Sequence, residues 1–148
     1  MANRPTQLSR LFLAVLTLSL ALSFISGLGL WYVHEQREKL GDLPAWTAAC
    51  QSLHGLLNPL ICASFGFLVA HMAGGWNMKA NRKSGVALAV SLFLLIATGA
   101  ALYYSQFRHF YFTIHLAAGL LLPFLLGGHW RQARRWVKRL AEPGENKK

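Results

Sequence analysis

Four of the six histidines in this 148-residue chain lie inside long uncharged stretches. They are His54, His71, His115 and His129. An imidazole inside a membrane span is costly unless it is bonded or bound, so such residues usually mark a site. Imidazole can ligate haem iron, zinc or copper, can relay protons, and can also simply bridge two helices. The positions of these histidines in the fold must decide between these chemistries.

Four uncharged runs position the histidines, at residues 11–33, 43–78, 85–107 and 110–130. Because a transmembrane helix needs about 20 apolar residues, each run is long enough to cross a bilayer once. We predict an all-α integral membrane four-helix bundle, a single domain over residues 1–148, with spans at about 11–33, 46–73, 85–107 and 110–130. The first run follows Arg4 and Arg10 as in a signal peptide, but it is longer than the usual apolar segment, so we expect a retained helix.

The distribution of charge predicts the orientation of the bundle. The chain is 54% hydrophobic yet carries a net charge of +10. With the N-terminus inside, 12 of the 15 Lys and Arg residues are cytoplasmic, so we predict both termini in the cytoplasm of a bacterial inner membrane. Residues 131–141 are expected to form a basic helix on the inner surface, and residues 142–148 a disordered tail. Basic residues that flank apolar runs indicate lipid headgroups, not nucleic acid, as the partner.

The four histidines fall into two levels on spans two and four, which run in the same direction. His54 and His115 lie in the outer third, whereas His71 and His129 lie near the inner face. We predict that each pair ligates one haem iron, giving an outer and an inner centre. Iron with two imidazole ligands has no open position and suits electron transfer. No C-x-x-C-H motif surrounds the two cysteines, so both haems would be b-type and non-covalently bound.

The spacing of these histidines differs between the two spans. The 14 residues from His115 to His129 are two heptads, which keep one face of a left-handed bundle. The 17 residues from His54 to His71 rotate the side chains by about 100° in a straight helix. Pro59 lies between them and could supply a kink, so His71 is the least secure ligand.

Other side chains have weaker expected roles. Arg82 and Arg131 are candidate partners for the propionates of the inner haem. A quinone headgroup could bind at the outer surface among aromatic and basic residues: His34, Tyr103, Tyr104, Arg108 and His109. Interfacial aromatics are common at such positions in any membrane protein.

Several short motifs resemble those of small bacterial membrane cytochromes b. The pattern H-x-x-x-G followed by H-W occurs at His115–Gly119 and His129–Trp130. Similar segments are Leu53–Gly55, His71 with Trp76, and residues 81–104. The resemblance covers about Trp46–Trp136. It implies four helices, two bis-histidine haems on His54, His71, His115 and His129, and electron relay between a quinone pool and a periplasmic or membrane redox protein. The 17-residue interval in span two departs from the usual spacing of about 14.

Three alternatives remain open from the residues alone. A non-redox anchor or assembly subunit would use its histidines only to bridge helices. A transporter, or a zinc or copper site, would use them as a relay or as ligands, but no carboxylate lies inside any span. We therefore expect an electron-transfer protein, or a subunit of a membrane oxidoreductase, and not a stand-alone catalyst.

Overall fold

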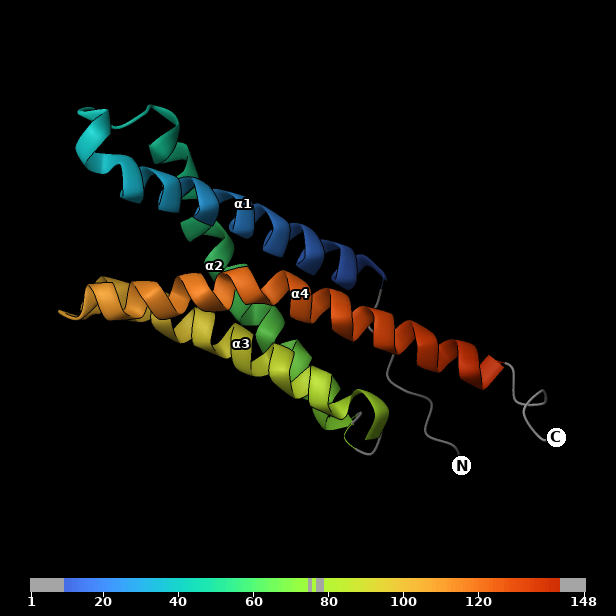
Figure 1. Ribbon diagram of the computed structural model, residues 1–148. Helices are drawn as coiled ribbons and strands as arrows, with labels where there is room; N and C mark the ends of the chain where they lie inside the picture. Colours follow the sequence, from blue (N-terminus) through green and yellow to red (C-terminus); the bar gives the residue numbers. More distant parts are fainter. Residues whose placement is uncertain (1–9, 75, 77–78, 142–148) are drawn as a thin grey trace. The chain divides into compact units, whose positions relative to one another are not determined.

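Over the residues described, the chain forms four helices and no strand. The computed structural model describes residues 10–74, 76 and 79–141. In chain order the helices are α1 (Arg10–Leu40), α2 (Trp46–Gly74), α3 (Lys79–Tyr104) and α4 (Arg108–Ala141) (Figure 1). The predicted all-helical class and the number of helices are confirmed.

All four helices are long and apolar enough to cross a membrane, as in a multi-pass membrane protein. The candidate spans are Arg10–Arg37, Trp46–Gly74, Arg82–Tyr104 and Arg108–Trp136. Large apolar side chains lie on the surface, with Leu56 76% exposed and Phe124 78% exposed. Such exposure is unfavourable in water over so many residues, but lipid tails solvate it without cost.

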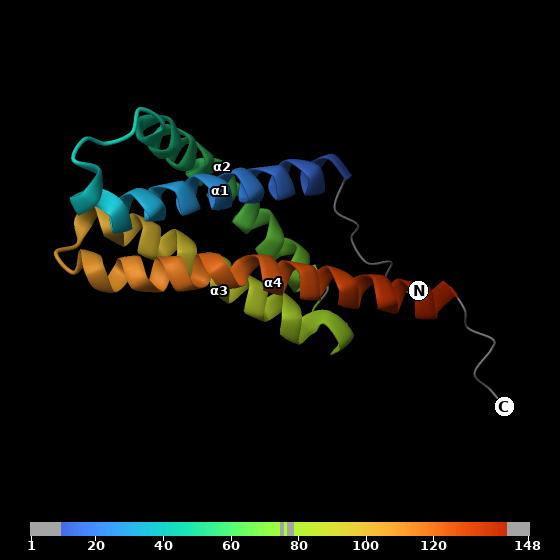
Figure 2. The same ribbon diagram turned by 45° about the horizontal axis from the view of Figure 1, so that its top comes forward.

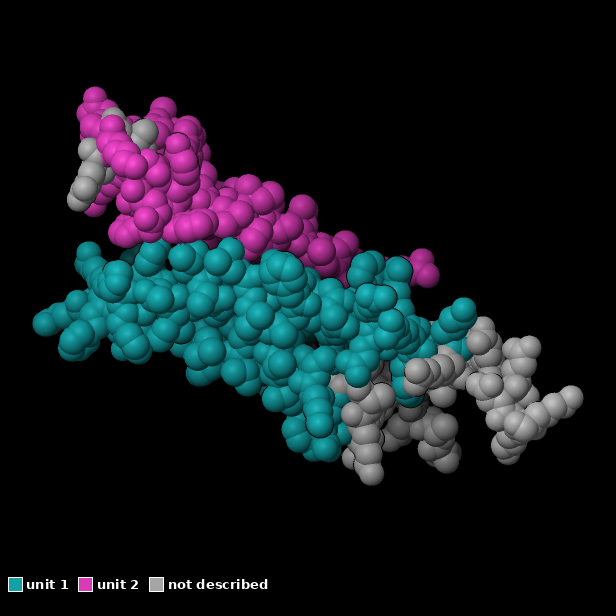
Figure 3. Space-filling model, viewed as in Figure 1, with its two compact units in different colours: residues 1–6, 68–148 teal, residues 7–67 magenta. Residues whose placement is uncertain are grey.

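Two compact units divide the chain within α2, between Phe67 and Leu68 (Figure 3). Unit 2 (residues 7–67) holds α1 and most of α2, and unit 1 holds the last turns of α2 with α3 and α4. In unit 2, the rings of Phe12 and Phe67 meet edge to face at 5.7 Å between centroids. This contact ties the start of α1 to α2.

Two helix ends differ from the predicted spans. Helix α1 continues to Leu40, through most of the segment expected as the first outer loop, and stops where Gly41 adopts a φ of 62°. Glycine takes this left-handed conformation readily and often ends helices. Helix α3 ends at Tyr104, three residues before the predicted limit, and the Phe107 N–H donates to Ser105 Oγ at 3.1 Å in the turn that follows.

Helix α4 runs unbroken from the fourth span into the basic segment. Its 34 residues correspond to about 51 Å at 1.5 Å per residue, more than the hydrocarbon thickness of about 30 Å. The Arg134 guanidinium lies over the Trp130 ring at 3.9 Å, a cation–π contact at the start of the basic part. The tail predicted at residues 142–148 lies outside the described residues.

Helices α3 and α4 pack side by side and antiparallel, as two views show (Figures 1 and 2). Along α3, hydroxyl residues recur every seven positions, at Ser84, Ser91 and Thr98. Each one contacts α4: Ser91 Oγ donates to the Ala118 carbonyl at 3.4 Å, and the other two reach histidines. A seven-residue repeat keeps one stripe of α3 against its neighbour, so these hydroxyls set the register of the helix pair.

Candidate functional site

His54 is held by two serines on α1, of which Ser26 is buried. Its Nδ1 lies 3.0 Å from the Ser23 carbonyl and 3.2 Å from Ser26 Oγ. Ser26 is only 1% exposed, and its hydroxyl donates to the same Ser23 carbonyl at 3.0 Å. The next residue, Gly27, faces the ring, since a Cβ there would lie 3.2 Å from His54 Cε1. The imidazole therefore lies directly against the α1 backbone.

His115 is held in the same way by α3. Its Nδ1 lies 3.1 Å from the Leu95 carbonyl and 3.1 Å from Thr98 Oγ1. The Thr98 hydroxyl donates to the Leu94 carbonyl at 2.5 Å, so its lone pair is the part that can face the imidazole. A Cβ at Gly99 would lie 3.2 Å from His115 Cε1.

His129 is held in a similar way, but by fewer and looser contacts. Its Nδ1 lies 3.0 Å from Ser84 Oγ. A Cβ at the following residue, Gly85, would lie 3.6 Å from His129 Cε1, which is ordinary van der Waals distance. Three imidazoles are thus held by a hydroxyl residue followed by glycine on the preceding helix of the chain.

These contacts determine which ring nitrogen carries the proton. A carbonyl oxygen can only accept, so the Nδ1 atoms of His54 and His115 must donate. In a neutral imidazole the lone pair then belongs to Nε2. Histidines that ligate metals are commonly fixed by such a bond from the other ring nitrogen, which orients the ring and raises its basicity.

Pairs of a Ser or Thr followed by a glycine, here called hydroxyl–glycine pairs, were not predicted from the sequence as functional residues. A Ser or Thr directly before Gly occurs three times in the sequence, at residues 26–27, 84–85 and 98–99. All three pairs contact a histidine. The interval from Ser84 to Thr98 is 14 residues, the same as from His115 to His129. These matching intervals are the sequence signal that could have found them.

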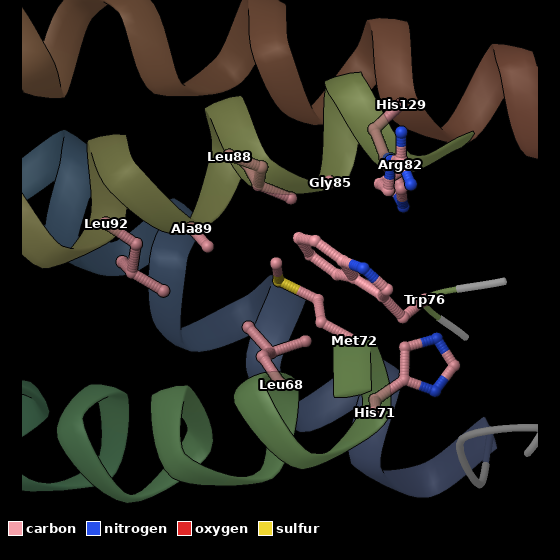
Figure 4. Close-up of a pocket in the computed structure, with 10 residues that line it drawn as sticks. All are labelled: Leu68, His71, Met72, Trp76, Arg82, Gly85, Leu88, Ala89, Leu92 and His129. Carbon is pink, nitrogen blue, oxygen red and sulfur yellow. The ribbon is translucent and has the colours of Figure 1, made fainter. Parts of the chain in front are cut away.

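A cavity of about 90 Å³ lies in unit 1, and both His71 and His129 line it. In Figure 4, His71 comes from the end of α2 and His129 from α4, on opposite sides of the cavity. Apolar side chains form most of the wall: Leu68, Met72, Leu88, Ala89 and Leu92. Arg82 also lines it, with its guanidinium 5.4 Å from the Trp76 ring centroid. The cavity is therefore an apolar space with two imidazoles and one cation.

Several other predicted site residues are exposed or lie in different units. Arg131 is exposed on α4 and does not line this cavity. Tyr103 and Tyr104, expected near a quinone headgroup, are 71% and 91% exposed. His54 belongs to unit 2 and His115 to unit 1, so the outer pair stays a prediction.

The described residues contain no cluster of side chains that could supply three or more ligands to a metal ion. No group of three or more His, Cys, Asp or Glu side chains gathers there. Cys50 and Cys62 are not joined in a disulfide. A tetrahedral zinc site usually takes four such ligands, whereas a haem iron needs only two from the protein.

No family model, curated protein or solved structure matches this chain. The likeness to small bacterial membrane cytochromes b therefore stays a prediction from its motifs.

Replacing the two α3 glycines with alanine tests how tightly the imidazoles are held. Alanine stabilises a helix interior by about 0.5–1 kcal/mol over glycine. Gly85→Ala should raise the thermal unfolding midpoint in detergent, because its Cβ makes only ordinary contact with His129. Gly99→Ala should lose this gain, because its Cβ would lie 3.2 Å from His115 Cε1. Equal stabilisation by both substitutions would contradict a tight fit at His115.

Proposed function

We propose that this chain is a di-haem b-type cytochrome of a bacterial inner membrane that relays electrons across the bilayer. The observation that carries the proposal is the repeated hydrogen bonding of imidazole through Nδ1, which assigns the lone pair to Nε2 in His54 and His115. A bound haem would supply a one-electron couple at its iron. With two imidazoles as axial ligands the iron has no position left for a substrate, which favours electron transfer over catalysis.

The inner centre would use His71 and His129. Both line the same cavity, and its apolar wall suits a porphyrin plane. Arg82 at this cavity is a candidate partner for a propionate, because guanidinium binds carboxylates with paired hydrogen bonds. The cavity volume of about 90 Å³ is smaller than the roughly 300–1,000 Å³ of small-molecule sites. A haem would therefore have to extend beyond this cavity.

The outer centre would use His54 and His115. Each is held by a backbone carbonyl and a buried hydroxyl, so each ring is fixed before any ligand binds. Preorganised ligands lose little conformational entropy on binding. The 14 residues between His115 and His129 separate the two levels by about 21 Å along α4. Two such levels would give electrons a route between the membrane faces, with a quinone pool and a periplasmic or membrane redox protein as the expected partners.

The orientation proposed for the bundle places both termini in the cytoplasm, because the basic residues concentrate on that side. A reporter fused after residue 148, active only in the cytoplasm, should be active. A second reporter, which is active only in the periplasm, should also be active when it is inserted in the turn between α3 and α4. The reverse pattern would contradict the orientation, although not the haem assignment.

The haem assignment is tested by the reduced-minus-oxidised spectrum and haem content of purified protein. We expect about two haems per chain, and about one after His115→Ala or His129→Ala. His109→Ala is the matched control on the same helix, because His109 is exposed and should leave the content unchanged. Full haem content in both ligand variants would refute the assignment.

A second function is favoured by the same contacts. His54, His115 and His129 each bridge two helices through Nδ1, which gives this polar group a partner inside a membrane. A non-redox anchor or assembly subunit would need no more than this. Colourless protein from haem-replete cells would support this function instead.

A further inference from the structure

We infer that Ser84 is the positioning residue of the inner centre, and that the axial imidazole of His129 depends on this one hydroxyl. The inference rests on the proposed haem ligation and concerns how the two centres differ. Helix α3 makes two hydrogen-bond contacts to the Nδ1 of His115 but only one to the Nδ1 of His129 among the described residues.

The Nδ1 of His115 has two acceptors on α3, the Leu95 carbonyl and the Thr98 hydroxyl, both at 3.1 Å. The Nδ1 of His129 lies 3.0 Å from Ser84 Oγ, and among the described residues no backbone carbonyl shares this contact. The glycine contact is also looser, at 3.6 Å for Gly85 against 3.2 Å for Gly99 (Figure 4 shows Gly85 and His129). Both differences leave the orientation of the His129 ring to Ser84.

This support affects the iron through the basicity of the imidazole. A ring that donates its Nδ1–H to an acceptor is a stronger base at Nε2, and a metal ligand held this way is a better electron donor. Stronger donation stabilises ferric over ferrous haem and so lowers the reduction potential. Loss of the Ser84 hydroxyl should therefore raise the potential of the centre that His129 ligates.

Thr98 provides the matched comparison. It lies 14 residues from Ser84 on the same helix and contacts the other α4 histidine. When Thr98 is replaced by alanine, the Leu95 carbonyl still accepts the His115 Nδ1–H. If Nε2 of His129 is bound to iron, its Nδ1 carries the proton and Ser84 Oγ accepts it. The two substitutions then remove equivalent hydroxyls, but only Ser84→Ala leaves an imidazole N–H without its acceptor.

The test is a spectroscopic redox titration of the purified full-length protein with Ser84→Ala, Ser84→Thr and Thr98→Ala. In Ser84→Ala we expect unchanged haem content and one potential raised by the equivalent of about a tenfold change in the reduced-to-oxidised ratio, about 59 mV for one electron. Ser84→Thr should restore the original value, because it keeps the hydroxyl. Thr98→Ala should shift its centre clearly less. Equal shifts in the two alanine variants, or none in Ser84→Ala, would overturn the inference.

A second readout separates this inference from the haem assignment. In ¹⁵N-histidine-labelled protein, with reduced haem or without haem, the Nδ1–H resonance of His129 should shift or exchange away in Ser84→Ala. The His115 resonance should persist in Thr98→Ala. If the protein binds no haem, the proposed function fails, and these resonances alone decide whether Ser84 holds the ring. An unchanged His129 resonance in Ser84→Ala would overturn the inference in either case.

Discussion

A neutral imidazole inside a membrane span has one N–H to donate and no water to receive it, so its neighbours must supply an acceptor. In this chain the partners come from the preceding helix: a backbone carbonyl accepts from His54 and from His115, each with a hydroxyl beside it, and the Ser84 hydroxyl lies at hydrogen-bond distance from His129. A glycine beside each hydroxyl lets the ring approach the backbone closely. This bond fixes the ring and assigns its remaining lone pair, and the proposed chemistry depends on that assignment.

The same bonds explain the packing of α3 against α4. Ser84, Ser91 and Thr98 form a seven-residue repeat that contacts α4 along its length. In lipid there is little hydrophobic drive for helices to associate, so close packing of small residues and interhelical hydrogen bonds must fix the register. Because the repeat on α3 matches the interval between His115 and His129, one register satisfies both histidines. Fold and candidate site are thus stabilised by the same contacts.

Length and hydropathy were sufficient to predict the four helices, because crossing a bilayer demands long uncharged runs. They were less informative at helix ends: α1 continues to Leu40 and stops only at Gly41, since polar residues after the span still form helix. Matched depth predicted that His71 and His129 form one site; both line one cavity, and their pairing at a haem stays a prediction. The hydroxyl–glycine pairs were not, because small residues are common in membrane helices and only the antiparallel register shows which of them face a histidine.

The most direct test of the central claim is pulsed electron paramagnetic resonance of the oxidised protein, labelled with ¹⁵N at histidine Nε2. Our account predicts low-spin ferric iron with strong hyperfine coupling to two labelled imidazole nitrogens at each centre. The absence of low-spin iron, or coupling that appears only when Nδ1 is labelled instead, would contradict it.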